Sequence, residues 1–150
     1  MNDDVERLAS VAIDCAVALH RQLGPGLLES VYELVLTEKL RRAGLGVERQ
    51  KAVPIEIDGL CIADAFRIDL LVEDKLIIEI KSIERLAPIH TKQVLTYLRL
   101  MKLPLGLLMN FGQETLRDGL RRVIDGPSSF VPLRLRANSP DPGDGAIAPR

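Results

Sequence analysis

Three charged side chains interrupt two apolar stretches of the sequence: Asp69, Glu79 and Lys81. Charged residues are rarely buried unless they are paired or bind an ion. Two neighbouring carboxylates repel each other unless one is protonated or a cation lies between them. Mg²⁺ prefers carboxylate oxygens, and a lysine nearby could hold a water or a phosphate oxygen. We interpret these residues as a candidate site. The simpler alternative is a half-exposed hairpin with one solvated, charged face.

The spacing of the two apolar stretches predicts a tight hairpin. Residues 66–72 and 76–80 are rich in β-branched residues, and three polar residues join them. A turn centred near Asp74 places Asp69 directly opposite Glu79. Directly opposed residues of antiparallel strands point to the same face, with their Cβ atoms about 4.5–5.5 Å apart. The two carboxylates are therefore expected to form a facing pair.

The same register places Arg67 opposite Lys81 and on the face of the carboxylates, because side chains alternate along a strand. Arg67 could contact a phosphate there, or pair with Asp69 or Glu79. The opposite face is expected to be apolar, and its predicted members are Ile68, Leu70, Val72, Ile78 and Ile80.

Length and composition are those of one ordinary globular domain. The chain has 150 residues, 47% of them hydrophobic and 27% charged, with a net charge of −1. With a net charge so close to zero, the chain as a whole has no excess of basic residues that would attract nucleic acid. No apolar run approaches the roughly 20 residues that span a bilayer, so no membrane association is expected.

Cys15 and Cys61 lie in apolar surroundings and are expected to be buried free thiols. Together with an acidic N-terminus, they favour a cytoplasmic location.

Periodicity and turn residues predict an alternation of helices and strands. Helices are expected from residue 5 to 23, from 27 or 28 to 43 and from 88 to 101, and strands over 47–57, 60–72, 75–81 and 105–111. Residues 114–123 could be a short helix or irregular, residues 130–136 could form an edge strand, and residues 137–150 are expected to be a disordered tail. The strand after the helix at Pro88 would pair by a crossover, so the sheet should be mixed. This order predicts a single α/β domain over residues 1–136.

An α-βββ-α-β order with an aspartate, then Glu-x-Lys on the next strand, resembles the PD-(D/E)XK nuclease superfamily. Here the motif is Asp69 followed by Glu79-Ile80-Lys81. Residues 26–32 match Gly-x-x-Glu-x-x-Tyr, the signature of the GxxExxY branch of that superfamily. Residues 66–72, 77–82 and 90–98 also look like this branch, and the resemblance covers residues 5–125. It implies a restriction-endonuclease-like fold with a mixed central sheet flanked by helices.

The resemblance also implies the roles of individual residues. Asp69 and Glu79 would be metal ligands for Mg²⁺ or Mn²⁺, and Glu29 would add a third carboxylate. Lys81 would orient the attacking water or stabilise charge on the phosphate. The implied activity is hydrolysis of a phosphodiester bond, in DNA in preference to RNA.

Gln93 and Tyr97 would form the Gln-x-x-x-Tyr element that some nucleases of the superfamily use beside the site. Four residues apart, they share one face of a helix. Simpler interpretations stay open. Tyr97 could be a core residue, Gln93 a surface amide, and Glu29 an acid favoured by the helix dipole. His20 and His90 lack metal-ligand spacing and are expected to be core or solvated histidines.

Two other functions remain open. The chain could be a non-catalytic module that retains the nuclease fold and binds nucleic acid or another protein. It could also be a structural homo-oligomer, since the leucine-rich residues 95–103 and the apolar run 103–109 could leave hydrophobic surface for a partner.

Overall fold

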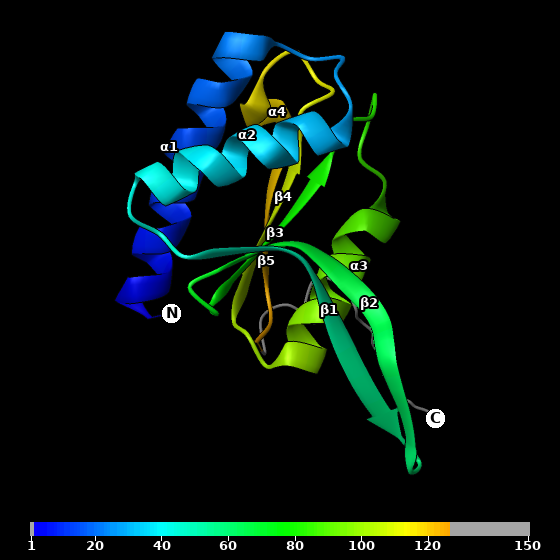
Figure 1. The fold of residues 1–150 in the computed structure, drawn as a ribbon. Coiled ribbons are helices and arrows are strands. Elements are labelled where there is room, and N and C mark those ends of the chain that lie inside the picture. The colour runs from blue at the N-terminus through cyan, green and yellow to red at the C-terminus, as the bar shows by residue number, and fades with distance from the viewer. Residues whose placement is uncertain (1, 127–150) are drawn as a thin grey trace, which may run out of the picture.

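The computed structural model describes residues 2–126, which form a five-stranded sheet with helices on both faces (Figure 1). In chain order the elements are α1 (Asp3–Leu23), α2 (Glu29–Arg42), β1 (Val47–Ile57), β2 (Leu60–Val72), β3 (Leu76–Lys81), α3 (Pro88–Met101), β4 (Leu105–Asn110), α4 (Leu116–Gly119) and β5 (Leu120–Ile124). The expected helices and the strands up to β4 are confirmed, most of them to within two residues.

The sheet is mixed, as predicted. Its strand order is β1-β2-β3-β4-β5, and every neighbouring pair is antiparallel except β3 and β4. Parallel neighbours need a crossover connection, and α3 supplies it. The β1–β2 turn is Asp58-Gly59, and both residues have positive φ, as a two-residue hairpin turn requires. The α/β fold class is therefore confirmed, with the sheet arrangement of a restriction-endonuclease-like domain.

The core has two layers, one on each face of the sheet. The α1 and α2 side packs on Leu70, Ile78 and Ile80, whereas α3 packs on Leu71 and Ile77. The central strands β3 and β4 are covered on both faces, which explains why they lack a polar alternation. Burial of each such aliphatic side chain stabilises the fold by about 1.5–3 kcal/mol.

Strand β5 was not predicted. It occupies the second half of residues 114–123, where we expected a short helix or irregular chain, and α4 before it has only four residues. Leu120–Ile124 pairs antiparallel with β4. The strand has one fully buried position, Val123, among exposed arginines. The stability of β5 therefore comes from main-chain pairing with β4, and the local sequence of residues 114–123 does not indicate this partner.

Two expectations about exposure are wrong. The apolar run that could have offered surface to a partner is buried as the central strand β4, from Leu105 to Met109. Cys61, expected to be buried, is exposed, whereas Cys15 is partly buried; both are free thiols. Cys61 lies near the tip of the β1–β2 hairpin, which extends beyond the helices (Figure 1), so nothing covers it.

Ile68 departs from the predicted alternation. It was expected to share a face with Leu70, but it packs with Leu71 and Ile77 on the α3 side. Opposite this point of β2, Gln50 of β1 has a φ of +50°. The regular pleat is thus interrupted beside the candidate site.

The predicted edge strand at 130–136, the predicted tail at 137–150 and the end of the predicted domain lie outside the described residues. Among residues 2–126, no helix combines the length and hydropathy needed to cross a membrane.

Candidate active site

The carboxylates of Asp69 and Glu79 meet where the β2–β3 pairing ends. The ladder pairs Leu70 with Ile78 in the predicted register. Beyond that pair, main-chain N–H groups donate to side-chain carboxylates instead of main-chain carbonyls. Asp69 N donates to Glu79 Oε1 at 3.0 Å, and Ile80 N donates to Asp69 Oδ2 at 2.8 Å. Each carboxylate therefore reaches the other's strand, and the expected facing pair is present.

Burial makes this pair electrostatically costly. Glu79 is only 5% exposed. Desolvation, followed by repulsion from Asp69, raises the pKa of Glu79 to about 8, although Lys81 acts in the opposite direction. Without a cation, the fold therefore favours the protonated form of Glu79. Carboxylate oxygens are the donors that hard divalent cations prefer, so the pair fits such an ion.

Lys81 lies at the end of β3, next to a surface pocket. The pocket has a volume of about 510 Å³ and is lined by Lys81, Ile89, His90, Lys92, Gln93, Thr96 and Tyr97. The structure therefore brings together three predicted site residues, from β3 and from α3. A larger pocket of about 650 Å³ lies near His20 and Thr115 and includes none of the predicted site residues.

Tyr97 connects the pocket to the carboxylates. Burial, followed by the charges of Glu79 and Asp69, raises the pKa of its hydroxyl, and a hydrogen bond with Gln93 acts against this. The ring stacks on Phe66 of β2, with centroids 4.3 Å apart and planes 7° apart. The Tyr97 ring on α3 thus packs against the sheet, and its hydroxyl is near enough to the acidic pair to interact with its charge.

Glu29 lies at the first position of α2 and reaches the chain just after Lys81. Its Oε2 accepts a hydrogen bond from Ser82 N at 3.3 Å, and Ser82 Oγ donates to the Leu27 carbonyl. Within the described part of the chain, no group of three His, Cys, Asp or Glu side chains lies close enough together to hold a metal ion. The donors brought together are those of Asp69 and Glu79, and a ligand role for Glu29 stays a prediction.

Arg67 does not pair with Asp69 or Glu79 as one alternative expected. Its guanidinium donates to the Gln50 carbonyl at 3.1 Å and to Asp64 Oδ2 at 3.0 Å. The β2–β3 ladder stops before it could bring Arg67 opposite Lys81. Arg67 therefore turns toward β1, and its contact with a phosphate stays a prediction.

The two histidines have structural roles. His20 is buried, and its Nε2 lies 2.9 Å from the Gln113 carbonyl, so it is the core histidine expected. His90 Nδ1 accepts from Ala87 N at the start of α3.

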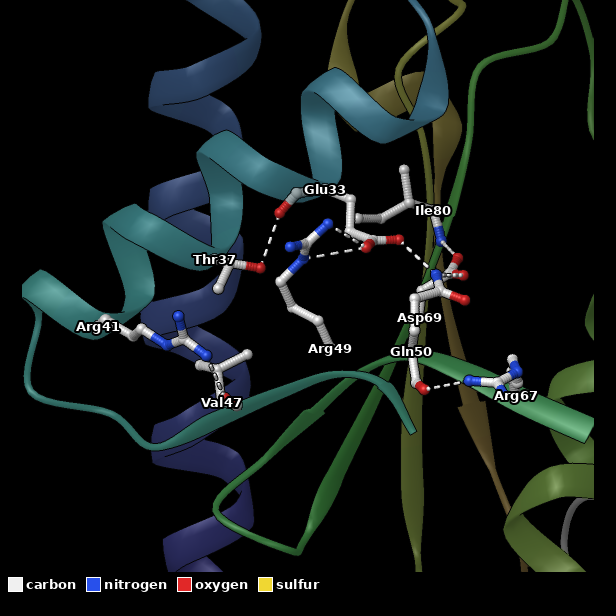
Figure 2. A network of polar contacts seen from close by, with 9 residues as sticks. All are labelled: Glu33, Thr37, Arg41, Val47, Arg49, Gln50, Arg67, Asp69 and Ile80. Carbon is white, nitrogen blue, oxygen red and sulfur yellow. Dashed lines mark hydrogen bonds and ion pairs between the residues drawn. The ribbon is translucent and has the colours of Figure 1, made fainter. Parts of the chain in front are cut away.

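Two polar residues near the site were not anticipated. Gln50 and the buried Glu33 form a hydrogen-bonded network that reaches Asp69 (Figure 2). Glu33 follows Glu29 by one helical turn, so the sequence could have indicated that the two acids share one face of a helix. Nothing in the local sequence, however, connects Glu33 to residues 50 and 69.

Asn110 was also missed, although a polar residue at the end of an apolar run was a signal. It is fully buried, and its side-chain amide bonds both the N–H and the carbonyl of Ile83. Asn110 therefore holds the segment that follows Lys81.

Comparison with known proteins agrees with this geometry. A sequence model described as the PD-(D/E)XK nuclease superfamily matches residues 6–123. This range includes both carboxylates, Lys81 and the α3 residues. No curated protein matches the chain.

Proposed function

Because the chain belongs to the PD-(D/E)XK nuclease superfamily, we propose that it is a metal-dependent nuclease that hydrolyses phosphodiester bonds in DNA in preference to RNA. Nucleases of this superfamily generally use divalent metal ions. The observation that supports the proposal best is the buried Glu79 beside Asp69, a pair that needs either a proton or a cation. We further propose that the chain is a member of the GxxExxY branch.

In this proposal the acidic residues hold Mg²⁺ or Mn²⁺. Asp69 and Glu79 supply the main oxygen ligands, and Glu29 adds a third carboxylate from α2. The bound ion would lower the pKa of a water and offset negative charge on the phosphate. The protein contributes the fixed position of the carboxylates, because Ile80 N holds Asp69 and Asp69 N holds Glu79.

Lys81 and the α3 residues act on the substrate. Lys81 borders the pocket and stabilises negative charge on the phosphate or orients the attacking water. Gln93 and Tyr97 bind substrate oxygens beside it, and the Phe66 stack keeps the Tyr97 ring in place. Arg67, exposed on β2, contacts a more distant phosphate.

The test is digestion of single-stranded and double-stranded DNA and of RNA with Mg²⁺ or Mn²⁺. Wild-type protein is expected to cleave DNA, whereas Asp69→Ala is expected to be inactive and Lys81→Ala to cleave much more slowly. Glu56→Ala removes an exposed carboxylate on β1 and should retain activity. If folded wild-type protein cleaves no form of nucleic acid with either metal, the proposal is wrong.

The near-neutral net charge of −1 favours one alternative, a module that retains the fold but binds nucleic acid or protein without cleavage. Salt-sensitive binding with no cleavage would identify the nucleic-acid version, because phosphate contacts release counterions.

A homo-oligomer is a further proposal. Ile57, Leu60 and Ile62 near the hairpin tip are exposed apolar residues, and light scattering would test it.

A further inference from the structure

Gln50 has an unusual backbone for a residue in the middle of a strand. Its φ is +50°, a region that residues other than glycine seldom occupy. It lies between the ladder pairs Arg49–Leu70 and Lys51–Ile68, and hence opposite Asp69. Non-glycine residues keep such conformations only where surrounding contacts hold them, and these places cluster at functional sites.

The side chain of Gln50 joins two carboxylates from different elements. Its Nε2 lies 2.7 Å from Glu33 Oε1 on α2 and 3.1 Å from Asp69 Oδ1 on β2 (Figure 2). An amide nitrogen carries two hydrogens, so each carboxylate receives one. Gln50 is thus a neutral donor to both acids.

Glu33 is the fixed end of this arrangement. It is 6% exposed, and its Oε2 accepts from Arg49 Nε at 3.1 Å and pairs with Arg49 Nη2 at 3.0 Å. With Oε2 held by the guanidinium, Oε1 remains directed at Gln50. The backbone of Gln50 is held as well, since its carbonyl accepts from Arg67.

Asp69 is therefore held at both oxygens. Ile80 N bonds Oδ2 from β3, and Gln50 Nε2 bonds Oδ1 from β1. Two donors on opposite sides set the rotation of the carboxylate, and each oxygen keeps a second lone pair for another partner. Partners that hold a ligand in this way influence metal affinity strongly in metalloproteins.

We propose that Gln50, anchored by Glu33, is a positioning residue that orients the Asp69 carboxylate for a divalent cation. This inference rests on the proposed function, which makes Asp69 a metal ligand. It explains both the unusual conformation of Gln50 and the buried Glu33–Arg49 pair, because together they hold the Asp69 carboxylate in one orientation.

The decisive variant is Gln50→Gly, which removes the amide and also relieves the positive φ. Its fold is therefore expected to be retained. Mn²⁺ binding to the full chain, measured by titration calorimetry, is expected to weaken about 10–100-fold. The matched control is Lys51→Ala, a change at the next residue of β1, which should bind Mn²⁺ like the wild type.

A second measurement needs no metal. The Ile80 amide donates to Asp69, so its hydrogen exchange, followed by NMR in a chelator, reports on the carboxylate. In Gln50→Gly this amide is expected to exchange at least about tenfold faster, because its acceptor is no longer held in place. The amides of Ile77 and Ile78, inside the ladder, should keep their wild-type rates.

The two measurements separate this inference from the proposed function. Unchanged Mn²⁺ affinity, or unchanged Ile80 exchange, in Gln50→Gly would overturn the positioning role. If the wild-type chain does not bind Mn²⁺, the metal-dependent function fails. Ile80 exchange then decides alone whether Gln50 orients the Asp69 carboxylate, with faster exchange supporting this and unchanged exchange overturning it.

Discussion

At the scale of single residues, the candidate site is defined by where charge is buried. Glu79 is almost inaccessible, Asp69 is partly exposed, and each accepts a main-chain N–H from the other's strand. The cost of this pair is largest when both are ionised. Proton binding and metal binding should therefore compete for the same two side chains.

Thermal stability of the metal-free protein should fall as pH rises. The pKa of Glu79 in the fold is about 8, against an ordinary value of 4.5. The folded state thus binds this proton more tightly than the unfolded state does. The stabilisation is complete below about pH 4.5 and is lost as pH rises through about 8. Melting temperatures recorded from pH 5 to 9 in a chelator should show this decline.

Glu79→Gln mimics the protonated carboxyl, so its decline over the same pH range should be much smaller. The exposed Glu56→Gln should keep the wild-type profile. Equal slopes in wild-type protein and Glu79→Gln would show that another group causes the pH dependence.

Lys81→Met should separate chemistry from metal binding. Removal of one group that stabilises developing charge typically lowers kcat by about 10²–10³-fold, and we expect a loss of that size in DNA cleavage. Mn²⁺ affinity should not weaken, because the ammonium is not a ligand. Lys51→Met, which alters a lysine paired with Glu48, serves as the control. A large rise in the dissociation constant for Mn²⁺ would contradict this role.

At the scale of elements, the position of α3 determines whether the side chains proposed to bind substrate reach the carboxylates. Val94 and Leu98 pack α3 onto the sheet, and Gln93 and Tyr97 are on the same helix. Gly106 of β4 lies directly beneath. A Cβ added there would lie 2.7 Å from Val94 Cγ1. Close helix–sheet contact at this glycine therefore sets the distance between α3 and the site.

Gly106→Ala should loosen this contact. Val94 has a β-branched side chain that cannot easily rotate away, and overpacking of this kind costs about 1–3 kcal/mol. Urea denaturation should report this loss of stability, and cleavage should fall because Gln93 and Tyr97 move outward with the helix. Gly126→Ala is the control, since its added Cβ meets no atom of the described residues within 4 Å. Unchanged stability in Gly106→Ala would refute the close-packing argument.

At the scale of the whole molecule, a net charge of −1 means that nucleic acid must be recognised locally. The pocket beside the carboxylates contains two lysines, Lys81 and Lys92. Binding through so few cations should be weak and only moderately sensitive to salt. The long β1–β2 hairpin extends away from the helices (Figure 1). Arg67, the proposed contact to a more distant phosphate, is exposed on β2 in this hairpin.

DNA binding by the Asp69→Ala variant should therefore show a shallow salt dependence. Two or three phosphate contacts predict a slope of roughly −2 to −3 for the logarithm of the association constant against that of salt concentration. Fluorescence anisotropy without divalent metal would measure it, and Lys92→Gln should reduce the slope by about 1. A slope near zero would exclude phosphate contacts, and a much steeper one would indicate a different, extensive basic surface.

Local patterns determined much of this protein. The β2–β3 register, the opposition of Asp69 and Glu79, the Asp58-Gly59 turn and the start of α3 at Pro88 all followed from alternation and turn chemistry within short stretches. These features depend on neighbours in sequence, so a single chain is sufficient to predict them.

Only the tertiary structure decided the rest. It paired β5 with β4, covered the run from Leu105 to Met109 on both faces and turned Arg67 toward β1. It also brought Gln50 to Asp69, 19 positions away, and to Glu33, 17 positions away. Such contacts form between segments that the fold brings together, and their stability comes from partners that no local periodicity specifies. The sequence therefore predicted the acidic pair, and the fold decided what surrounds and orients it.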